Sequence, residues 1–378
     1  MCNISSAFSK KIFKNYRFLI LKKSIKKFFT MSGNSDNYNN NDKGSHTPSS
    51  FSPSPKNNSN NRNYNNNNNN NNNSTTRWTP RYPTTLPTKE QLSISEVPYV
   101  DSHTHLHYVL DKLPDKFNVT SYEILKQDHF PSNFESCINV LCDPLSFNSN
   151  EIFPDTHLDW KKMVDVPFMY LAVGVHPHNA KDYNDYIENN MIQILKHPKC
   201  IALGEIGLDY HYNISPRDTQ KDVLVKQIEK AIELEKPLVI HTREAEEDTW
   251  DILTGFVPKE WKIHVHCFTD SPQFAKKLLN YFPNLYIGIT GVVTFGSAKN
   301  TQNVIRDIVP LNRFLLETDA PYMIPAKLNR NKRSDSKVTV CHSGMIPLIA
   351  ERIAQLKGME LDEIMNHARE NTRNMYGI

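Results

Sequence analysis

Short apolar segments alternate with longer amphipathic ones along most of this chain, from about residue 98 to its end. The short segments are rich in β-branched and aromatic residues, which is typical of buried strands. The amphipathic stretch 219–235 repeats apolar side chains at roughly helical spacing, and further helices are predicted at 346–357 and 361–375. The predicted strands cover residues 99–106, 137–142, 169–176, 200–208, 237–241, 262–268, 285–292 and 314–318. Eight strands alternating with helices predict an α/β fold of the (β/α)8 barrel type, the TIM barrel.

The first predicted strand lacks the glycine-rich turn of a dinucleotide-binding fold. No Gly-x-Gly-x-x-Gly sequence follows it, which favours a closed barrel over a doubly wound sheet and excludes a dinucleotide cofactor from our expectations. Residues 108–135 are long for a connection between a strand and a helix. We expect them to form a loop decoration near the site.

The composition changes sharply upstream of the first strand. Residues 31–96 are rich in Asn, Ser, Pro and Thr and include an unbroken Asn run at 65–73. Such a stretch cannot bury enough apolar surface to offset its ordering entropy, so we predict a disordered linker. Residues 97–378 are long enough for one large core and match the size of a single barrel domain.

Residues 1–30 form a basic N-terminal segment with eight Lys or Arg and no Asp or Glu. Basic residues interleaved with apolar ones are typical of a mitochondrial targeting segment, and a disordered basic arm is the alternative. The six cysteines are scattered, which fits a reducing compartment, so the cytoplasm or nucleus is expected unless the segment acts as a targeting signal. No apolar run is long enough to span a bilayer, and no membrane partner is expected.

The net charge of +3 conceals an acidic folded part. From residue 98 onward the chain has 30 Lys and Arg against 37 Asp and Glu, a net charge of −7. A protein that held nucleic acid through a broad basic surface would carry the opposite sign. If the chain binds nucleic acid, metal ions or one basic loop must supply the positive charge.

Residues that commonly bind metals gather at the predicted strand ends. His103 and His105 lie two residues apart on the first strand, so both imidazoles point to one face. Barrel enzymes place their sites at the carboxyl ends of the strands. The chain contains four His-x-His pairs, against roughly 0.6 expected in a shuffled chain. Further candidates close the fourth, fifth, sixth and eighth strands: Glu205, His241, His266 and Asp319.

Six ordered motifs across residues 98–378 resemble those of the TatD family of metal-dependent deoxyribonucleases. They read DSHTHL from Asp101, GVHPH from Gly174, GEIGLDY from Gly204, IHTRE from Ile240, HCF from His266 and ETDAPY from Glu317. The resemblance implies a barrel of the amidohydrolase type that binds two divalent cations and hydrolyses DNA, in several members as an exonuclease.

The family pattern also implies a role for each candidate ligand. His103, His105 and Asp319 would hold one metal, His241 and His266 the second, and Glu205 would bridge both. Oxygen and imidazole ligands suit Mg²⁺, Mn²⁺ or Zn²⁺. In a two-metal site, one ion activates a water and both stabilise charge on the phosphate oxygens. Asp319 is expected to accept the proton of this water, which makes Asp319 and Glu205 the candidate catalytic residues.

Candidates for binding the substrate have weaker signals. His178 could contact the phosphate or support a ligand, and Arg243 could bind phosphate or form a buried ion pair. His264 is expected to pack one layer below His266. The basic loop after the eighth strand could bind the nucleic-acid backbone or be merely solvated; its cations are Lys327, Arg330, Lys332, Arg333 and Lys337.

One segment departs from the family pattern, and it concerns the choice of substrate rather than the metal ligands. Many bacterial relatives have an Arg-Asn-Glu-Pro segment after the eighth strand, where this chain reads VCHSGMIP from Val340. We therefore expect DNA as partner, with RNA as the alternative, and leave the oligomeric state open. The rival functions are a small-molecule amidohydrolase or phosphotriesterase and a non-catalytic nucleic-acid-binding barrel. Relatives of the first kind commonly bridge their metals with a carboxylated Lys where this chain has Glu205, and the second has no need of all six ligands.

Overall fold

A computed structural model describes residues 85–378 of the chain, apart from residues 153, 331, 334 and 335. The expectations for the basic segment 1–30, and for the linker as far as residue 84, fall outside these residues.

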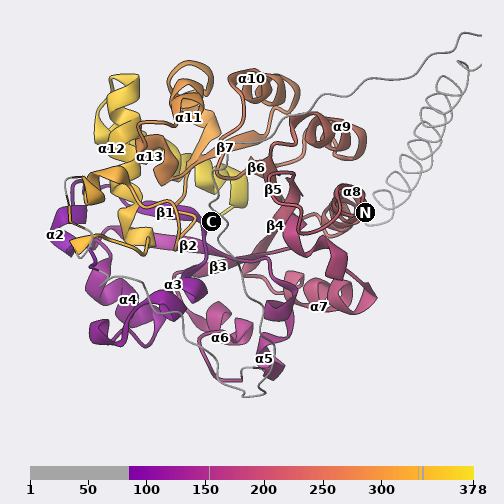
Figure 1. Cartoon of the computed structure of the whole chain (residues 1–378), viewed down its shortest axis with the longest axis horizontal. Coiled ribbons are helices and arrows are strands. Elements are labelled where there is room, and N and C mark those ends of the chain that lie inside the picture. Colours follow the sequence, from indigo (N-terminus) through magenta and orange to yellow (C-terminus); the bar gives the residue numbers. More distant parts are fainter. Residues whose placement is uncertain (1–84, 153, 331, 334–335) are drawn as a thin grey trace, which may run out of the picture. The chain divides into compact units, whose positions relative to one another are not determined.

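Eight parallel strands form one sheet in the order of the chain (Figure 1). They surround a common axis, and most helices lie outside them, so the fold is a TIM barrel as predicted. The strands are β1 (Tyr99–Thr104), β2 (Phe134–Leu141), β3 (Met169–Val173), β4 (Cys200–Asp209), β5 (Leu238–Arg243), β6 (Ile263–Val265), β7 (Leu285–Ile289) and β8 (Phe314–Leu316). The Asp319 amide donates to the His103 carbonyl oxygen at 2.9 Å, which joins the chain after β8 to β1.

The α-helices alternate with these strands. In chain order they are α2 (Lys89–Leu92), α3 (Leu106–Lys112), α4 (Tyr122–His129), α5 (Ser149–Ile152), α6 (Trp160–Asp165), α7 (Asp185–Leu195), α8 (Arg217–Glu233), α9 (Glu246–Phe256), α10 (Pro272–Tyr281), α11 (Lys299–Asn303), α12 (Ile346–Lys357) and α13 (Leu361–Tyr376).

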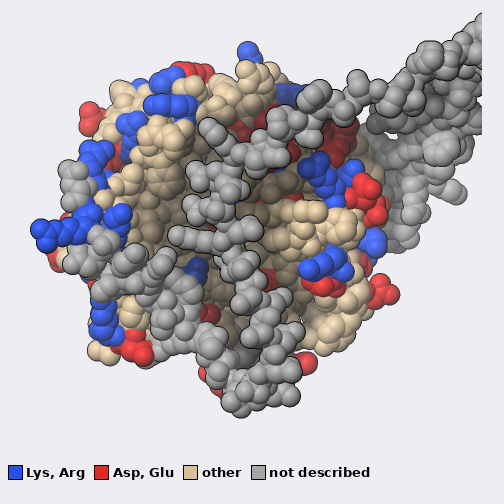
Figure 2. All heavy atoms as spheres, in the orientation of Figure 1, with Lys and Arg blue, Asp and Glu red and all other residues tan. Residues whose placement is uncertain are grey.

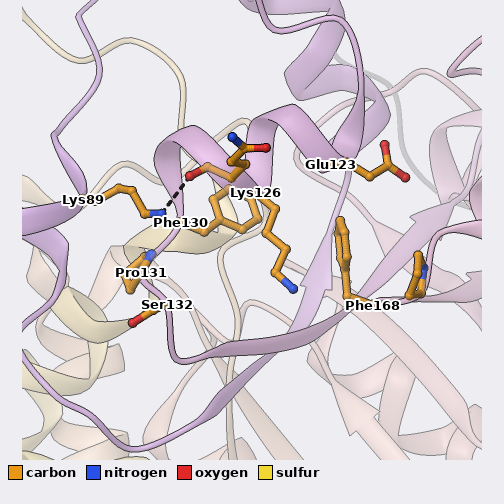
Figure 3. Close-up of a pocket in the computed structure, with 9 residues that line it drawn as sticks. Lys89, Glu123, Lys126, Phe130, Pro131, Ser132 and Phe168 are labelled. Carbon is orange, nitrogen blue, oxygen red and sulfur yellow. Dashed lines mark hydrogen bonds between the residues drawn. The ribbon is translucent and has the colours of Figure 1, made fainter.

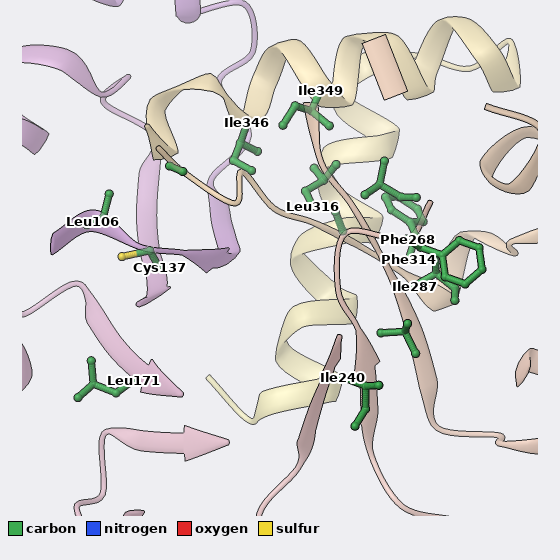
Figure 4. Packing of buried hydrophobic residues seen from close by; sticks show 14 of the residues in the cluster. Leu106, Cys137, Leu171, Ile240, Phe268, Ile287, Phe314, Leu316, Ile346 and Ile349 are labelled. Carbon is green, nitrogen blue, oxygen red and sulfur yellow. The ribbon is translucent and has the colours of Figure 1, made fainter. Parts of the chain in front are cut away.

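Alternation along each strand divides the buried side chains into two groups. The larger group packs between strands and helices; Figure 4 shows Ile346 and Ile349 of α12 close to Leu316 of β8. The smaller group includes small and branched residues such as Ala172 and Ala202, and Tyr376 at the end of α13 packs with it. It forms a separate apolar layer on the inner strand faces of the barrel, and the end of α13 contributes to it.

Two predictions about the connections need correction. Residues 108–135 are not a loop decoration, because they contain the rest of α3 and all of α4, whose Tyr122 and Leu125 are buried. The described packing also begins before residue 97. Leu92 of α2 is fully buried, and the Thr85 amide donates to the Lys337 carbonyl oxygen at 3.3 Å. Among the described residues, no helix has both the length and the hydropathy needed to cross a bilayer.

Candidate active site

The carboxylate of Glu205 on β4 lies at the centre of the predicted ligands. Its Oε2 atom faces the first strand, 3.5 Å from His103 Nε2 and 3.9 Å from His105 Nε2. Its Oε1 atom faces the other side, 2.9 Å from His266 Nε2 and 2.8 Å from His241 Nδ1. The two carboxylate oxygens therefore face different imidazoles on opposite sides, as a bridging ligand requires.

Asp319 completes the group on the side of β1. Its Oδ1 atom lies 3.5 Å from His105 Nε2 and 3.9 Å from His103 Nε2. The residue follows β8 with a φ of 50°, a left-handed conformation that Asp and Asn adopt more readily than most side chains.

The hydrogen bonds of two histidines orient them as ligands. His105 Nδ1 lies 2.8 Å from the Val140 carbonyl oxygen and must donate to it, which leaves Nε2 with its lone pair toward the carboxylates. His241 has the opposite arrangement, because its Nε2 contacts Asp209 Oδ2 at 3.3 Å and its Nδ1 faces Glu205. A carboxylate or carbonyl behind an imidazole is the usual support of a metal-binding histidine.

Several buried polar atoms in the cluster have no hydrogen-bond partner within the described chain. Both ring nitrogens of His103 and Nδ1 of His266 are in this state, although buried polar atoms are normally hydrogen-bonded. His103, His105 and Glu205 have ligand atoms within 4.8 Å of one another, as do His103, His266 and Asp319. The donor set of imidazole and carboxylate groups therefore fits divalent cations.

Burial and charge act in opposite directions on the ionisation of these groups. Burial, helped by the charge of His266, lowers the pKa of His103 to about 4. Burial would also lower the pKa of His266, but the charge and hydrogen bond of Glu205, together with the charges of Glu317 and Asp319, outweigh it and raise this pKa to about 10. Burial would raise the pKa of Glu205, yet the surrounding histidines hold it well below its usual value. Glu205 is thus ionised and His103 neutral, the forms that bind metal, whereas His266 must give up a proton when it binds one.

A second polar layer lies beneath the ligands. His264 Nε2 is 2.9 Å from Glu317 Oε2, and His264 Nδ1 is 2.7 Å from the Tyr376 hydroxyl. Gly288 of β7 leaves room for this pair, since a Cβ there would lie 2.4 Å from His264 Nε2. Asp101 accepts hydrogen bonds from the Thr318 amide and hydroxyl at 2.9 and 2.6 Å. His264 therefore packs below His266, as expected, and this layer fixes the strand ends that present the ligands.

His178 and Arg243 flank the cluster on the β4–β5 side. His178 Nε2 contacts Asp209 Oδ2 at 3.0 Å, the same oxygen that lies near His241, so His178 supports a candidate ligand through Asp209. The guanidinium of Arg243 lies 5.1 Å from the ring centre of Tyr212. Within the described chain Arg243 has no carboxylate partner, so the alternative of a buried ion pair is not observed.

The basic loop stands apart from the ligands. Lys327 pairs with Glu351 of α12 at 2.8 Å, while Arg330, Lys332, Arg333 and Lys337 are exposed. Asn329 closes the base of the loop through two hydrogen bonds of 2.9 Å to the Val338 backbone. No described contact links the loop cations to the metal cluster, and their role in binding the substrate backbone stays a prediction.

Comparison with known proteins decides the family. The model of the TatD related DNase family matches residues 100–377, nearly the whole described barrel. The chain belongs to the TatD family. It is therefore a hydrolase of that family, and its relatives include proteins named as metal-dependent hydrolases.

Relatives of this TatD-family chain differ in their named activities. A human protein named 3'-5' RNA nuclease TATDN2 is 37% identical over 281 residues, which cover 74% of this chain but only 35% of the human protein. The metal-dependent hydrolase YabD of Bacillus subtilis is 36% identical over 56% of this chain and 78% of its own. A protein of Pantoea vagans, named 3'-5' ssDNA/RNA exonuclease TatD, is 29% identical over 56% of this chain and 79% of its own.

Solved structures confirm the fold. A TatD family hydrolase from Entamoeba histolytica superimposes with a TM-score of 0.60 at 19% identity, over 74% of this chain and 98% of its own. The TatD homologue YJJV of Escherichia coli gives 0.58 at 22% identity, over 75% of this chain and 100% of its own.

Two residues of the site were not among the predicted ligands. His176 Nε2 lies 3.4 Å from Glu205 Oε1, and His176, Glu205 and His241 form a third group of potential ligands. His176 Nδ1 accepts the His178 amide at 3.1 Å, so a neutral His176 carries its proton on Nε2 and donates toward Glu205. Asp209 contacts both His178 and His241. Both residues stand in the quoted motifs, but spacing alone does not show which atoms face the cluster.

The surface of the TatD-family barrel has mixed charge. Figure 2 shows Lys and Arg side chains along the margin near α2 and α12 and again near α7 and α8, with Asp and Glu between them. This distribution agrees with the net charge of −7 for the folded part, and the described Lys and Arg side chains in this view form no continuous basic surface.

A cavity of about 380 Å³ lies away from the ligands (Figure 3). It sits between α4 and the amino ends of β2 and β3, where Lys126 reaches toward Phe168, with Nζ 4.8 Å from the ring centre. Lys89 Nζ donates to the Gln127 carbonyl oxygen at 2.7 Å on the same rim. The amino ends of barrel strands serve stability rather than catalysis, so we exclude this cavity from the site.

Proposed function

We propose that this chain is a two-metal nuclease that hydrolyses phosphodiester bonds and removes nucleotides from the end of a single strand. DNA is the expected substrate and RNA the second candidate. The observation that carries the proposal is the position of Glu205, whose two oxygens face two separate imidazole groups. A carboxylate in that position can hold two cations about 3.5–4 Å apart, the spacing of two-metal phosphodiesterases.

The candidate ligands would have different roles in hydrolysis. His103, His105 and Asp319 would hold one cation, His241 and His266 the other, and Glu205 would contact both. When bound, the cations would supply an acidified water and charge to stabilise the phosphate oxygens in the transition state. Asp319 keeps an ionised carboxylate, because His105 and its neighbours lower its pKa despite burial. It can therefore accept the proton of the attacking water.

The named activities of the relatives support nucleic acid as the substrate, but they do not decide between DNA and RNA. One relative is named for RNA and another for both single-stranded DNA and RNA, and both names specify the 3'-5' direction. The human relative is nearly three times as long as the matched region. The activity of that whole protein therefore need not belong to the matched region alone.

A digestion assay tests the proposal. Oligonucleotides of DNA and RNA, single- and double-stranded and labelled at the 5' end, are incubated with the protein and Mg²⁺ or Mn²⁺, with and without chelator. We expect a ladder that shortens stepwise on single strands and disappears with chelator or in the Asp319→Asn variant. Cleavage that persists in that variant, or no cleavage of any nucleic acid with either ion, would contradict the proposal.

A further inference from the structure

The exposed large apolar residues of the described barrel all lie on one side of it. Each follows the carboxyl end of a strand and precedes or begins the next major helix, which is the side of the candidate active site. They are Leu145, Ile152, Tyr186, Tyr212, Ile214 and Tyr322. We call these six residues the apolar fringe. Single exposed apolar residues are common on protein surfaces, so only members with a further feature bear on the substrate.

Tyr212 is the first of two tyrosines in this fringe that pair with a cation. Tyr212 is 48% exposed, and the Arg243 guanidinium lies 5.1 Å from the centre of its ring. Its amide donates to Asp209 Oδ1 at 3.2 Å, and its ring meets that of His178 edge-on at 5.6 Å. Tyr212 is thus held by the same carboxylate that supports His241.

Tyr322 repeats the arrangement on another wall of the barrel. It is 46% exposed, and Lys112 Nζ lies 4.1 Å from its ring centre. Its amide donates to the Asp319 carbonyl oxygen at 3.0 Å, three residues after the catalytic candidate. In each case the backbone amide of the tyrosine is bonded to a residue of the site, and the ring has a cation within cation–π distance.

The two pairs lie on opposite walls. Tyr212 follows β4 and Arg243 is the last residue of β5. Tyr322 follows β8, and Lys112 is the last residue of α3, the helix after β1. In an eight-stranded barrel that runs in chain order, these strand pairs face each other across the axis, with the Glu205 cluster between them. A strand lying across the mouth would meet one tyrosine on each side of the bond to be cut.

Resting on the proposed function, we infer that Tyr212 and Tyr322 are stacking platforms for the two nucleobases that flank the cleaved phosphodiester. Arg243 and Lys112 contact the adjoining phosphates. Every base has a π-face, so stacking binds without reading sequence. It also requires unstacked bases, which a single strand offers and a duplex does not.

Binding measurements with stacking variants test this inference. In the Asp319→Asn background, the affinity for a labelled single-stranded oligonucleotide is measured by fluorescence anisotropy. Tyr212→Leu and Tyr322→Leu should each raise Kd about tenfold to hundredfold, the range for a lost base stack. Tyr212→Phe and Tyr322→Phe keep the ring and should restore the parent Kd. Tyr186→Leu is the matched control, because Tyr186 is 62% exposed and bears no cation contact within the described chain; its Kd should not change.

Abasic substitutions distinguish stacking from a general structural effect. An abasic nucleotide is placed in turn at each of the three 3'-terminal positions. One position should cancel the penalty of Tyr212→Leu, and the neighbouring position should cancel that of Tyr322→Leu. Unchanged Kd values in both leucine variants, or penalties that no abasic position removes, would overturn the inference.

The cleavage assay separates this inference from the proposed function. If the wild-type protein cleaves single strands but the abasic pattern is absent, stacking is wrong and the nuclease assignment stands. If the wild-type protein cleaves nothing while the abasic pattern is present, the platforms bind nucleic acid and the nuclease assignment fails. If it neither binds nor cleaves single strands, both are wrong.

Discussion

Individual atoms of a few residues decide what this site can bind. The tautomer of His105 is fixed by the Val140 carbonyl, and that of His241 is favoured by the Asp209 carboxylate. Glu205 then offers one oxygen to each side. These features come from single hydrogen bonds, so single substitutions should affect them separately from the fold.

Asp319→Asn should abolish turnover and leave the structure intact. The amide keeps the size of the side chain and tolerates the φ of 50°, but it removes a ligand charge and the proton acceptor together. We expect the cleavage rate to fall by at least about 10²–10⁴, the typical contribution of a general base. The melting temperature of the metal-free protein serves as the control for folding. A rate near that of the wild type would remove Asp319 from the mechanism.

His342 should make the barrel sensitive to acid. Its ring is buried and stacked on Phe130 at 5.3 Å, and burial lowers its pKa to about 3. The unfolded chain takes up this proton near pH 6.5 and the folded chain only near 3, so stability is lost as the pH falls between these values. In that window, one such group changes the unfolding free energy by up to about 1.4 kcal/mol per pH unit.

The variant His342→Asn isolates this contribution. Asn can still accept the Gly344 amide that His342 Nδ1 accepts at 3.2 Å, but it does not titrate. Urea unfolding at pH 7 and pH 5 should show a smaller difference for the variant than for the wild type. Equal differences would mean that His342 is accessible to protons in the folded state.

At the scale of elements, the sequence predicted the strands and helices closely, with the exact ends in some cases and not in others. The helix expected at 346–357 is observed at Ile346–Lys357, while the first strand, expected to reach residue 106, ends at Thr104. Apolar residues continue past that point because Leu106 begins α3 and packs in the same core. Periodicity does not distinguish a buried strand end from the start of a buried helix.

The six candidate ligands could be named from the sequence because they stand near strand ends in ordered motifs, and their binding of metal stays a prediction. His176 and Asp209 could not be assigned, since their contacts depend on ring orientation and on which carboxylate oxygen faces inward. The polar layer of His264, Glu317 and Tyr376 joins β6, β8 and the end of α13, segments up to 112 residues apart. No local pattern in the sequence predicts that contact.

The space left by Gly288 in β7 should matter for stability. A Cβ at Gly288 would lie 2.4 Å from His264 Nε2 and 2.5 Å from Glu317 Oε1, so Gly288→Ala must displace a buried pair. We expect a loss of about 1–3 kcal/mol in unfolding free energy, the usual cost of overpacking. Gly255→Ala in α9 is the matched control: nothing lies within 4 Å of its added Cβ, and Ala should stabilise a helix by about 0.5–1 kcal/mol. If both variants unfold at the same urea concentration, the layer is looser than described.

At the scale of the whole molecule, a barrel of net negative charge relies on a few cations for its anionic substrate. The candidate positive groups are the metal ions, Arg243, Lys112 and the loop after β8. None of the six candidate ligands lies before residue 103, so the long N-terminal part carries no ligand of the predicted site.

Two truncations locate the start of the functional unit. Removing residues 1–84 should leave unfolding free energy and cleavage of short oligonucleotides unchanged. Removing residues 1–92 also deletes Leu92, which is fully buried, and the Lys89 contact to Gln127. Loss of a buried Leu alone should cost about 1.5–3 kcal/mol. Loss of activity in the shorter truncation, despite a normal unfolding curve, would show that residues 1–84 take part in the reaction.

Anomalous diffraction from crystals grown with Mn²⁺ or Zn²⁺ tests the central claim most directly. The account predicts two anomalous peaks about 3.5–4 Å apart, with Glu205 contacting both, His103, His105 and Asp319 around one, and His241 and His266 around the other. A single peak, or two peaks of which only one touches Glu205, would contradict the two-metal site on which the proposed function rests.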